Sequence, residues 1–214
     1  MYQPAHFKEE RIDVLHQLIR KNPLGALVSM TADGLTANHI PFEVVESPAP
    51  FGTLHAHVAR ANPLWKEAAG KDVMVIFQGA DAYISPSWYP SKKDHGKVVP
   101  TWNYAVVHAH GPIKVLDDAE WLHALVCKLT NQHESKMPAP WQVTDAPADF
   151  IDTMVKAIVG IEIPLARLVG KWKVSQNRPA ADRAGTIAGL HGVGTEAANA
   201  MAELVPSGAS DLAR

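Results

Sequence analysis

The segment HVARANPLW, residues 57–65, combines residue types that suit an anion. Asn62 is a favoured helix N-cap, and proline, which follows it, is a favoured first helical residue. A helix start presents unpaired N–H groups, and the planar donor fork of Arg60 suits phosphate oxygens. His57 could join them from the preceding strand. The pattern indicates a phosphate site, with a capping asparagine and a solvated arginine as the alternative.

Histidines recur in two HxH pairs, His55 with His57 and His108 with His110. The members of each pair share one face of a strand because side chains alternate along it. Two such pairs could ligate zinc or iron, and a single histidine such as His133 could ligate haem. The alternative is that the pairs line a polar sheet face. With no HExxH motif and no cysteine pair, we expect no metal site.

Several function classes are excluded by what the chain lacks. There is no GxSxG, GxGxxG or GxxxxGK[ST] motif, and the single cysteine, Cys127, lies on the apolar side of an expected helix. A net charge of -2 argues against a chain-wide electrostatic grip on nucleic acid. No apolar leader begins the chain and no apolar run is long enough to cross a membrane, so we expect a cytoplasmic protein.

Two further segments carry possible binding groups. In residues 84–104 the rings of Trp88, Tyr89 and Trp102 surround a loop that contains three lysines, which could bind single-stranded nucleic acid or simply be solvated: Lys92, Lys93 and Lys97. The segment KWKVSQNR at 171–178 offers donors to a polar cofactor or forms a solvated strand end.

The periodicity of the chain predicts the elements that carry these groups. Helical spacing is expected over 7–21, 63–69, 148–158 and a stretch that opens with a capping box of Asp117 and Glu120. Strands are expected over 24–30, 35–45, 52–58, 72–79, 81–85, 101–111, 113–116 and 161–169. Asp33-Gly34 predicts a hairpin, Pro41 an edge or a bulge, and 113–116 the hairpin partner of 101–111.

These elements predict a mainly β, α+β fold, a β-barrel with helices packed outside. We expect a single domain over 1–190, with inserted and C-terminal helices, and a flexible tail over 191–214, which is rich in Ala, Gly and Ser.

Taken together, the motifs resemble one family. NHIPF (38–42), HVARANPLW (57–65), YISPSWY (83–89), VPTWNY (99–104), AIVGIEI (157–163) and KWKVSQNR (171–178) closely resemble the PaiB-type FMN-binding negative transcriptional regulators, over about residues 1–190. The resemblance implies a split β-barrel similar to the pyridoxamine 5'-phosphate oxidases, and a homodimer with FMN at the subunit interface.

The resemblance also implies site residues. The segment 38–42 would lie along the flavin and 57–62 would contact its phosphate, with Ala59-Arg60-Ala61-Asn62 in place of the oxidases' serine-arginine-lysine run. We expect Trp88, Tyr89 and Trp102 to wall the flavin pocket or the dimer seam, with core packing as the alternative for Trp102. The candidate cofactor-binding residues are Asn38, His39, Ile40, Pro41, His57, Val58, Ala59, Arg60, Asn62, Trp88, Tyr89, Thr101, Trp102, Asn103, Lys173 and Gln176.

The function implied is that of a flavin-dependent sensor and regulator. Because no basic recognition helix is apparent, DNA or another regulatory partner would be engaged indirectly. The alternatives are a flavin-dependent oxidoreductase that acts on a small molecule, and a haem-binding barrel protein.

Overall fold

The computed structural model describes residues 1–208, and the chain forms two compact units. Unit 1 comprises Met1–Leu18, Gln78–Val107 and the chain from Val169 on, and unit 2 comprises Ile19–Phe77 and His108–Leu168. The sequence predicts a single domain over 1–190, and both compact units draw residues from that range. Strand periodicity could not show the division, because three strands each contribute residues to both units: β6 (Asp72–Ile84), β7 (Thr101–Pro112) and β10 (Arg167–Lys173).

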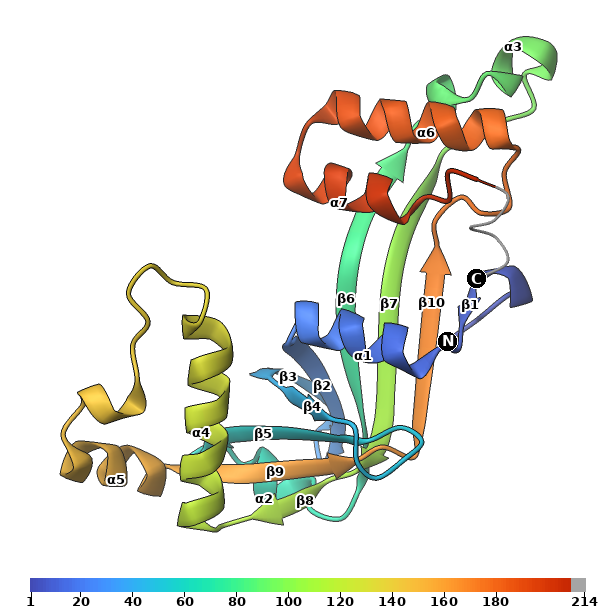
Figure 1. Ribbon diagram of the computed structural model, residues 1–214. Helices are drawn as coiled ribbons and strands as arrows, with labels where there is room; N and C mark the ends of the chain where they lie inside the picture. Colours follow the sequence, from blue (N-terminus) through green and yellow to red (C-terminus); the bar gives the residue numbers. More distant parts are fainter. Residues whose placement is uncertain (209–214) are drawn as a thin grey trace. The chain divides into compact units, whose positions relative to one another are not determined.

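The strands of the described residues form two sheets (Figure 1). A six-stranded sheet has the order β1-β10-β7-β6-β2-β3, and a four-stranded sheet has the order β4-β5-β9-β8. The remaining bounds are β1 (Lys8–Glu9), β2 (Leu24–Thr31), β3 (Gly34–Pro41), β4 (Glu43–Val45), β5 (Thr53–Ala59), β8 (Lys114–Leu116) and β9 (Ile158–Pro164). With its helices, the chain has the α+β class that the sequence predicts.

Helices occur between and after the strands. The α-helices are α1 (Ile12–Lys21), α2 (Leu64–Glu67), α3 (Ser91–His95), α4 (Ala119–Glu134), α5 (Ala148–Lys156), α6 (Ala180–Val193) and α7 (Glu196–Leu204), and the 3-10 helices are η1 (Ala5–Phe7), η2 (Pro86–Trp88) and η3 (Val143–Asp145). Helix α4 is capped by Asp118, whose side chain accepts the N–H of Trp121, and not by Asp117 as predicted. Among residues 1–208, no helix is both long and apolar enough to cross a membrane.

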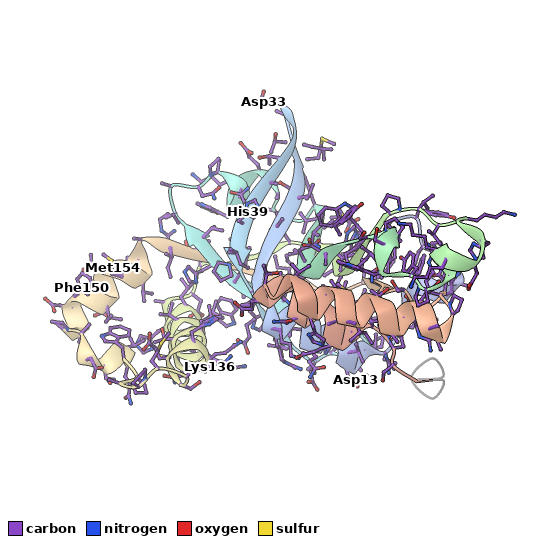
Figure 2. All side chains as sticks on the ribbon, turned by 90° about the horizontal axis from the view of Figure 1, so that it is seen from above. Asp13, Asp33, His39, Lys136, Phe150 and Met154 are labelled. Atoms are coloured by element: carbon purple, nitrogen blue, oxygen red, sulfur yellow. The ribbon has the colours of Figure 1, made fainter. Side chains whose placement is uncertain are left out.

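The predicted hairpin at Asp33-Gly34 is confirmed. Strands β2 and β3 pair antiparallel from Leu24 opposite Pro41 to Thr31 opposite Gly34. Gly34 has a φ of 109°, a conformation that side chains other than hydrogen rarely adopt. Asp33 lies at the tip of this hairpin (Figure 2).

The predicted return strand over 35–45 is two strands. Strand β3 ends at Pro41, and β4 pairs with β5 in the other sheet. Proline has no N–H to donate to the ladder, and the next N–H, that of Phe42, donates to Pro23 O at 2.9 Å. The expected edge position of Pro41 is confirmed, because β3 is the last strand of its sheet.

Two other strand assignments also change. The run 113–116 is β8, which pairs with β9 and not with β7. The run 161–169 contains the end of β9 and the start of β10, which lie in different sheets. The runs 72–79 and 81–85, expected to be separate, form the single strand β6.

The core of unit 2 lies between strands of both sheets. Leu27, Leu54 and Val75 are fully buried. Phe42 packs edge-on against Phe77, with their ring centroids 5.8 Å apart. This core fixes the positions of β3 and β5, which carry the first group of candidate residues.

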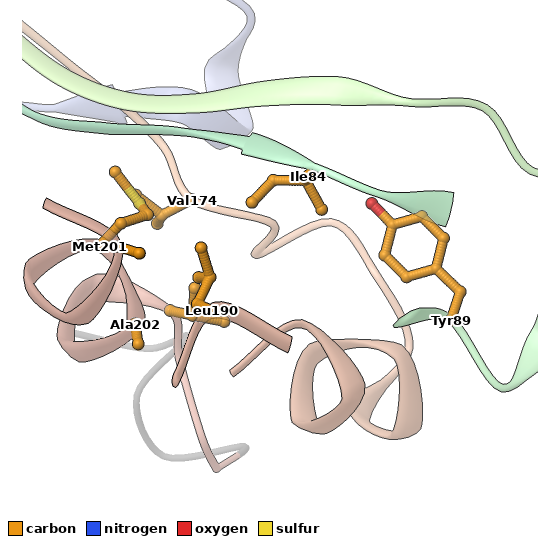
Figure 3. Close-up of a cluster of buried hydrophobic side chains, with 8 residues drawn as sticks. Ile84, Tyr89, Val174, Leu190, Met201 and Ala202 are labelled. Atoms are coloured by element: carbon orange, nitrogen blue, oxygen red, sulfur yellow. The ribbon is translucent and has the colours of Figure 1, made fainter. Parts of the chain in front are cut away.

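The core of unit 1 is formed by α6, α7, the loop around Tyr89 and the ends of β6 and β10. Figure 3 shows Ile84, Tyr89, Val174, Leu190, Met201 and Ala202 gathered in this cluster. The expected flexible tail is wrong over 196–204, which forms helix α7, while residues 209–214 lie outside the described residues. Burying a side chain such as Met201 contributes about 1.5–3 kcal/mol, which offsets the entropy lost in ordering the segment.

Candidate functional site

The candidate residues form two groups, one in each unit. Unit 2 contains those of β3 and of β5 with the turn that follows it: Asn38, His39, Ile40, Pro41, His57, Val58, Ala59, Arg60 and Asn62. Unit 1 contains those of η2, β7 and β10 with their flanking residues: Trp88, Tyr89, Thr101, Trp102, Asn103, Lys173 and Gln176.

In unit 2, a hydrogen-bond chain joins β3 to the turn after β5. The N–H of Asn62 donates to Ala59 O at 2.8 Å, which closes the turn. The side-chain Oδ1 of Asn62 accepts the N–H of Leu64 at 2.9 Å, and its Nδ2 donates to Asn38 Oδ1 at 2.9 Å. The structure thus brings together two candidate residues that the sequence could only place on separate segments.

The four candidates of β3 are divided between two faces. Asn38 is half-buried and Ile40 is buried, while His39 and Pro41 are exposed on the other face. This division follows from the alternation of side chains along a strand. A single ligand lying on one face of β3 would therefore contact only alternate members of the predicted set.

Arg60 is held by protein groups. Its guanidinium donates to both carboxylate oxygens of Asp117, at 2.6 and 2.9 Å, and to the backbone oxygens of Lys156 and Ile158, at 2.8 and 3.0 Å. The hydrogen bond from Arg60 lowers the pKa of Asp117. Arg60 therefore connects both ends of the segment 117–157, and a phosphate that bound both terminal nitrogens of Arg60 in the bidentate position would have to displace Asp117.

The predicted helix start after Asn62 is short. Helix α2 has four residues, and Asn62 Oδ1 binds the first N–H as the capping interpretation predicts. A single turn has little macrodipole, because the dipole grows with aligned peptide units. The helix itself therefore adds little to an anion site.

The histidine pairs are not gathered around a common point. His55 lies 3.5 Å from Glu162 and packs edge-on against Trp121, with ring centroids 5.2 Å apart. Burial lowers the pKa of His57, and its Nδ1 atom is buried without a hydrogen-bond partner in the described chain. In residues 1–208, no cluster of three or more His, Cys, Asp or Glu side chains could hold a metal ion.

In unit 1, β7 and the end of β10 form the second polar group. Lys173 Nζ donates to Trp102 O at 2.8 Å and to the hydroxyl of Thr101. Burial lowers the pKa of Lys173, and the charges of nearby Lys171 and Arg178 act in the same direction. The strand pair therefore holds one partly desolvated cation beside an exposed aromatic ring.

Behind this cation lies a buried polar contact. Asn103 Nδ2 donates to Ser175 Oγ at 2.9 Å, and both residues are buried. Ser175 has a φ of 63°, which is uncommon for a residue with a side chain. Gln176 binds locally, since its Oε1 accepts the N–H of Val174 and its Nε2 donates to His6 O. Asn103 and Gln176 thus support the backbone around Lys173.

The aromatic candidates occupy different environments. Trp102 is 55 % exposed and packs edge-on against Tyr83, a neighbour that the sequence analysis did not single out. Tyr89 is 2 % exposed and belongs to the core of unit 1, with Arg178 over its ring. Trp88 packs against helix α6. Tyr89 thus packs in the core of unit 1 with residues of α6 and α7, and its expected place at the flavin pocket or the dimer seam stays a prediction.

Comparison with known proteins identifies the relatives of this chain. Residues 1–167 match the family described as "Putative FMN-binding domain". An uncharacterised protein of Emericella nidulans is 36% identical, and the Bacillus subtilis protease synthase and sporulation protein PAI 2 is 31% identical, each alignment covering 96% of both chains.

Solved structures share the fold at low sequence identity. The FAD and heme binding protein from Mycobacterium smegmatis matches with a TM-score of 0.58 and 14% identity, covering 78% of this chain and 73% of that one. A conserved hypothetical protein from Mycobacterium tuberculosis matches with a TM-score of 0.57 and 14% identity, covering 84% and 94%. The fold is thus a split β-barrel, and the chain belongs to the family described as "Putative FMN-binding domain" and is a relative of PAI 2.

Proposed function

We propose that this protein binds FMN and acts as a flavin-dependent sensor in regulation. The observation that carries the proposal is that the family match over residues 1–167 contains the Asn38–Asn62 pair of unit 2 and the strand β7 of unit 1. The relationship to PAI 2, a protein named for protease synthesis and sporulation, supports the regulatory part. When bound, FMN supplies the redox chemistry, so the protein needs only to hold and orient it.

Each unit by itself offers groups that suit a part of a flavin. Amide donors at Asn38 suit carbonyl or phosphate oxygens, and Lys173 offers a positive charge to an anion. The exposed Tyr83–Trp102 pair offers apolar ring surface against which a planar ring system could pack.

We further propose a homodimer with FMN at the subunit interface. The face of the β2–β3 hairpin that points away from the core carries Leu24, Met30 and Leu35, which are 60%, 56% and 74% exposed. Exposed apolar side chains gathered on one edge hairpin favour burial against another protein surface. A second copy of the chain is the occupant that this proposal assigns to them.

The absorption spectrum of the purified protein, followed by titration of FMN against it, tests the proposal. We expect flavin absorption bands, or saturable quenching of FMN fluorescence by added protein. Heat-unfolded protein serves as the control for nonspecific quenching. If neither FMN, FAD nor riboflavin is quenched by the folded protein, flavin binding is wrong and the proposal falls.

A further inference from the structure

Polar side chains form a row on one face of the β2–β3 hairpin. Directly opposed residues of an antiparallel pair share a face, and the register sets Leu27 opposite Asn38 and Ser29 opposite Thr36. Leu27 is fully buried, so this face packs on the core of unit 2. Ser29 is buried, while Thr36 and Asn38, on the edge strand β3, are half-buried. The row lies where the buried face of the hairpin reaches the surface.

The directions of the hydrogen bonds in this row are set by a backbone N–H group. The N–H of Leu64 donates to Asn62 Oδ1 at 2.9 Å, and this bond cannot be reversed because a backbone nitrogen is only a donor. The other half of the Asn62 amide, Nδ2, is therefore the atom that faces Asn38, where Oδ1 accepts at 2.9 Å. Oxygen and nitrogen of an amide have nearly the same shape, so the network decides the orientation.

Asn38 is consequently left with its NH2 group directed away from Asn62. In residues 1–208 this nitrogen has no hydrogen-bond partner, although the side chain is half-buried. Because this nitrogen is not fully buried, a ligand can reach its two N–H groups. Asn38 therefore presents N–H donors to the surroundings. The backbone N–H of Leu64 determines this orientation, because it fixes the orientation of the Asn62 amide that Asn38 faces.

A second observation also points to a ligand on this face. The hydroxyl of Ser29 is buried, the residue being 3% exposed, and it has no hydrogen-bond partner in the described residues. Ser29 is a diagonal neighbour of Asn38 across the hairpin, at a separation of roughly 7–8 Å between such positions. Buried hydroxyls are normally paired, so this face has polar groups that the chain does not itself satisfy.

We propose that Asn62 is a positioning residue that holds the Asn38 amide with its donors outward, so that Asn38 binds a hydrogen-bond acceptor of the flavin. This inference rests on the proposed function. The acceptor is a carbonyl oxygen of the ring system or an oxygen of the phosphate, which share the same chemistry. A ligand that presents a donor at this point would face two N–H groups and be rejected.

Two substitutions of Asn62, by Asp and by Ala, distinguish its effect on the orientation of the Asn38 amide from its effect on the stability of the turn. In Asn62→Asp, one carboxylate oxygen still accepts the N–H of Leu64, and the other accepts from Asn38, which turns its own oxygen outward. We expect FMN affinity to fall about tenfold or more, because a hydrogen bond is lost and two acceptors face each other, while the melting temperature stays near that of the native chain.

Asn62→Ala removes both bonds and leaves Asn38 free to rotate. We expect a smaller loss of FMN affinity than in Asn62→Asp, but a larger fall in melting temperature, because the turn loses its side-chain hydrogen bond. If Asn62 has a purely structural role, Asn62→Ala should lose more FMN affinity than Asn62→Asp, because aspartate preserves the hydrogen bond of the turn and alanine does not. Asn131→Asp, on an exposed position of α4, controls for the added negative charge.

Titrating each variant with both FMN and riboflavin identifies which acceptor of the flavin Asn38 binds. Equal losses for FMN and riboflavin assign it to the ring or ribityl part, and a loss confined to FMN assigns it to the phosphate. If Asn62→Asp fails to fold, Asn38→Asp gives the same test, since it keeps the bond from Asn62 and turns a carboxylate oxygen outward.

Two results would overturn the inference, and they are distinguishable. If the native chain binds no flavin, the proposed function is wrong and this inference falls with it. If the native chain binds FMN but folded Asn62→Asp binds it equally well, or binds it better than Asn62→Ala, the polarity role is wrong and the proposed function stands.

Discussion

The hydrogen-bond partners of Arg60 and Asn62 could not be predicted from their residue types. Arg60 and Asn62 belong to one motif that suits phosphate, yet Arg60 pairs with Asp117 and Asn62 orients Asn38. Both partners come from other segments of the chain. The motif therefore does not state which groups each of its side chains contacts.

The pairing of Arg60 with Asp117 leads to a prediction about FMN affinity. If Arg60 contacts the flavin phosphate, as the family resemblance implies, Asp117→Asn should tighten FMN binding, because a neutral partner releases the guanidinium more readily. Arg60→Ala should weaken it, and neither change should alter riboflavin binding, since riboflavin has no phosphate. Fluorescence titration with both flavins measures this.

The contrary outcome has its own structural meaning. If Arg60→Ala binds FMN normally but melts at a lower temperature, Arg60 has only a structural role. That role is to connect the two ends of the segment 117–157, since it also binds the backbone oxygens of Lys156 and Ile158.

At the scale of elements, the C-terminal helices decide the environment of the aromatic loop. Asp182 of α6 accepts the N–H and the hydroxyl of Ser91 at 3.1 and 2.7 Å, which ties the helix to the start of α3. Glycines allow α6 to approach the loop: a Cβ on Gly185 would lie 2.0 Å from Trp88 O. The absence of a side chain at position 185 therefore permits this close packing of α6 on the loop.

This close approach predicts opposite effects of two glycine substitutions on one helix. Gly185→Ala should destabilise the protein by about 1–3 kcal/mol, because the new methyl group meets a backbone oxygen that cannot easily move. Gly192→Ala, which meets nothing within 4 Å, should be neutral or stabilise by up to about 1 kcal/mol. Urea denaturation measures both, and similar losses would contradict the packing described for α6.

At the scale of the whole molecule, the candidate residues belong to two compact units. Each unit has its own core and its own polar group, with Asn38 and Asn62 in one and Lys173 with Thr101 in the other. The proposed homodimer adds a second copy of both groups.

Leu35 provides a test of the proposed homodimer. It is 74% exposed on the hairpin face that points away from the core, so Leu35→Glu should leave the monomer folded and weaken self-association. Phe150→Glu on α5, where Phe150 is 53% exposed (Figure 2), is the matched control and should not change the mass in solution. Light scattering across a concentration series measures the mass, and a monomeric native chain would contradict the homodimer.

The sequence by itself determined the class of the fold, most of the elements and the family. Periodicity locates β2, β5, β7 and α5 because local alternation and helical spacing are properties of contiguous residues. The joint occurrence of the motifs pointed to the family to which the chain belongs.

Only the tertiary structure decided which segments meet. The pairing of β8 with β9, the burial of α7 and the partners of Arg60 and Asn62 depend on residues distant in the chain. The orientation of the Asn38 amide depends on one backbone N–H at Leu64, which no local pattern records. The composition of a segment shows which hydrogen bonds and contacts its side chains are able to make. Which of them form, and in which direction, depends on the groups that folding places beside that segment.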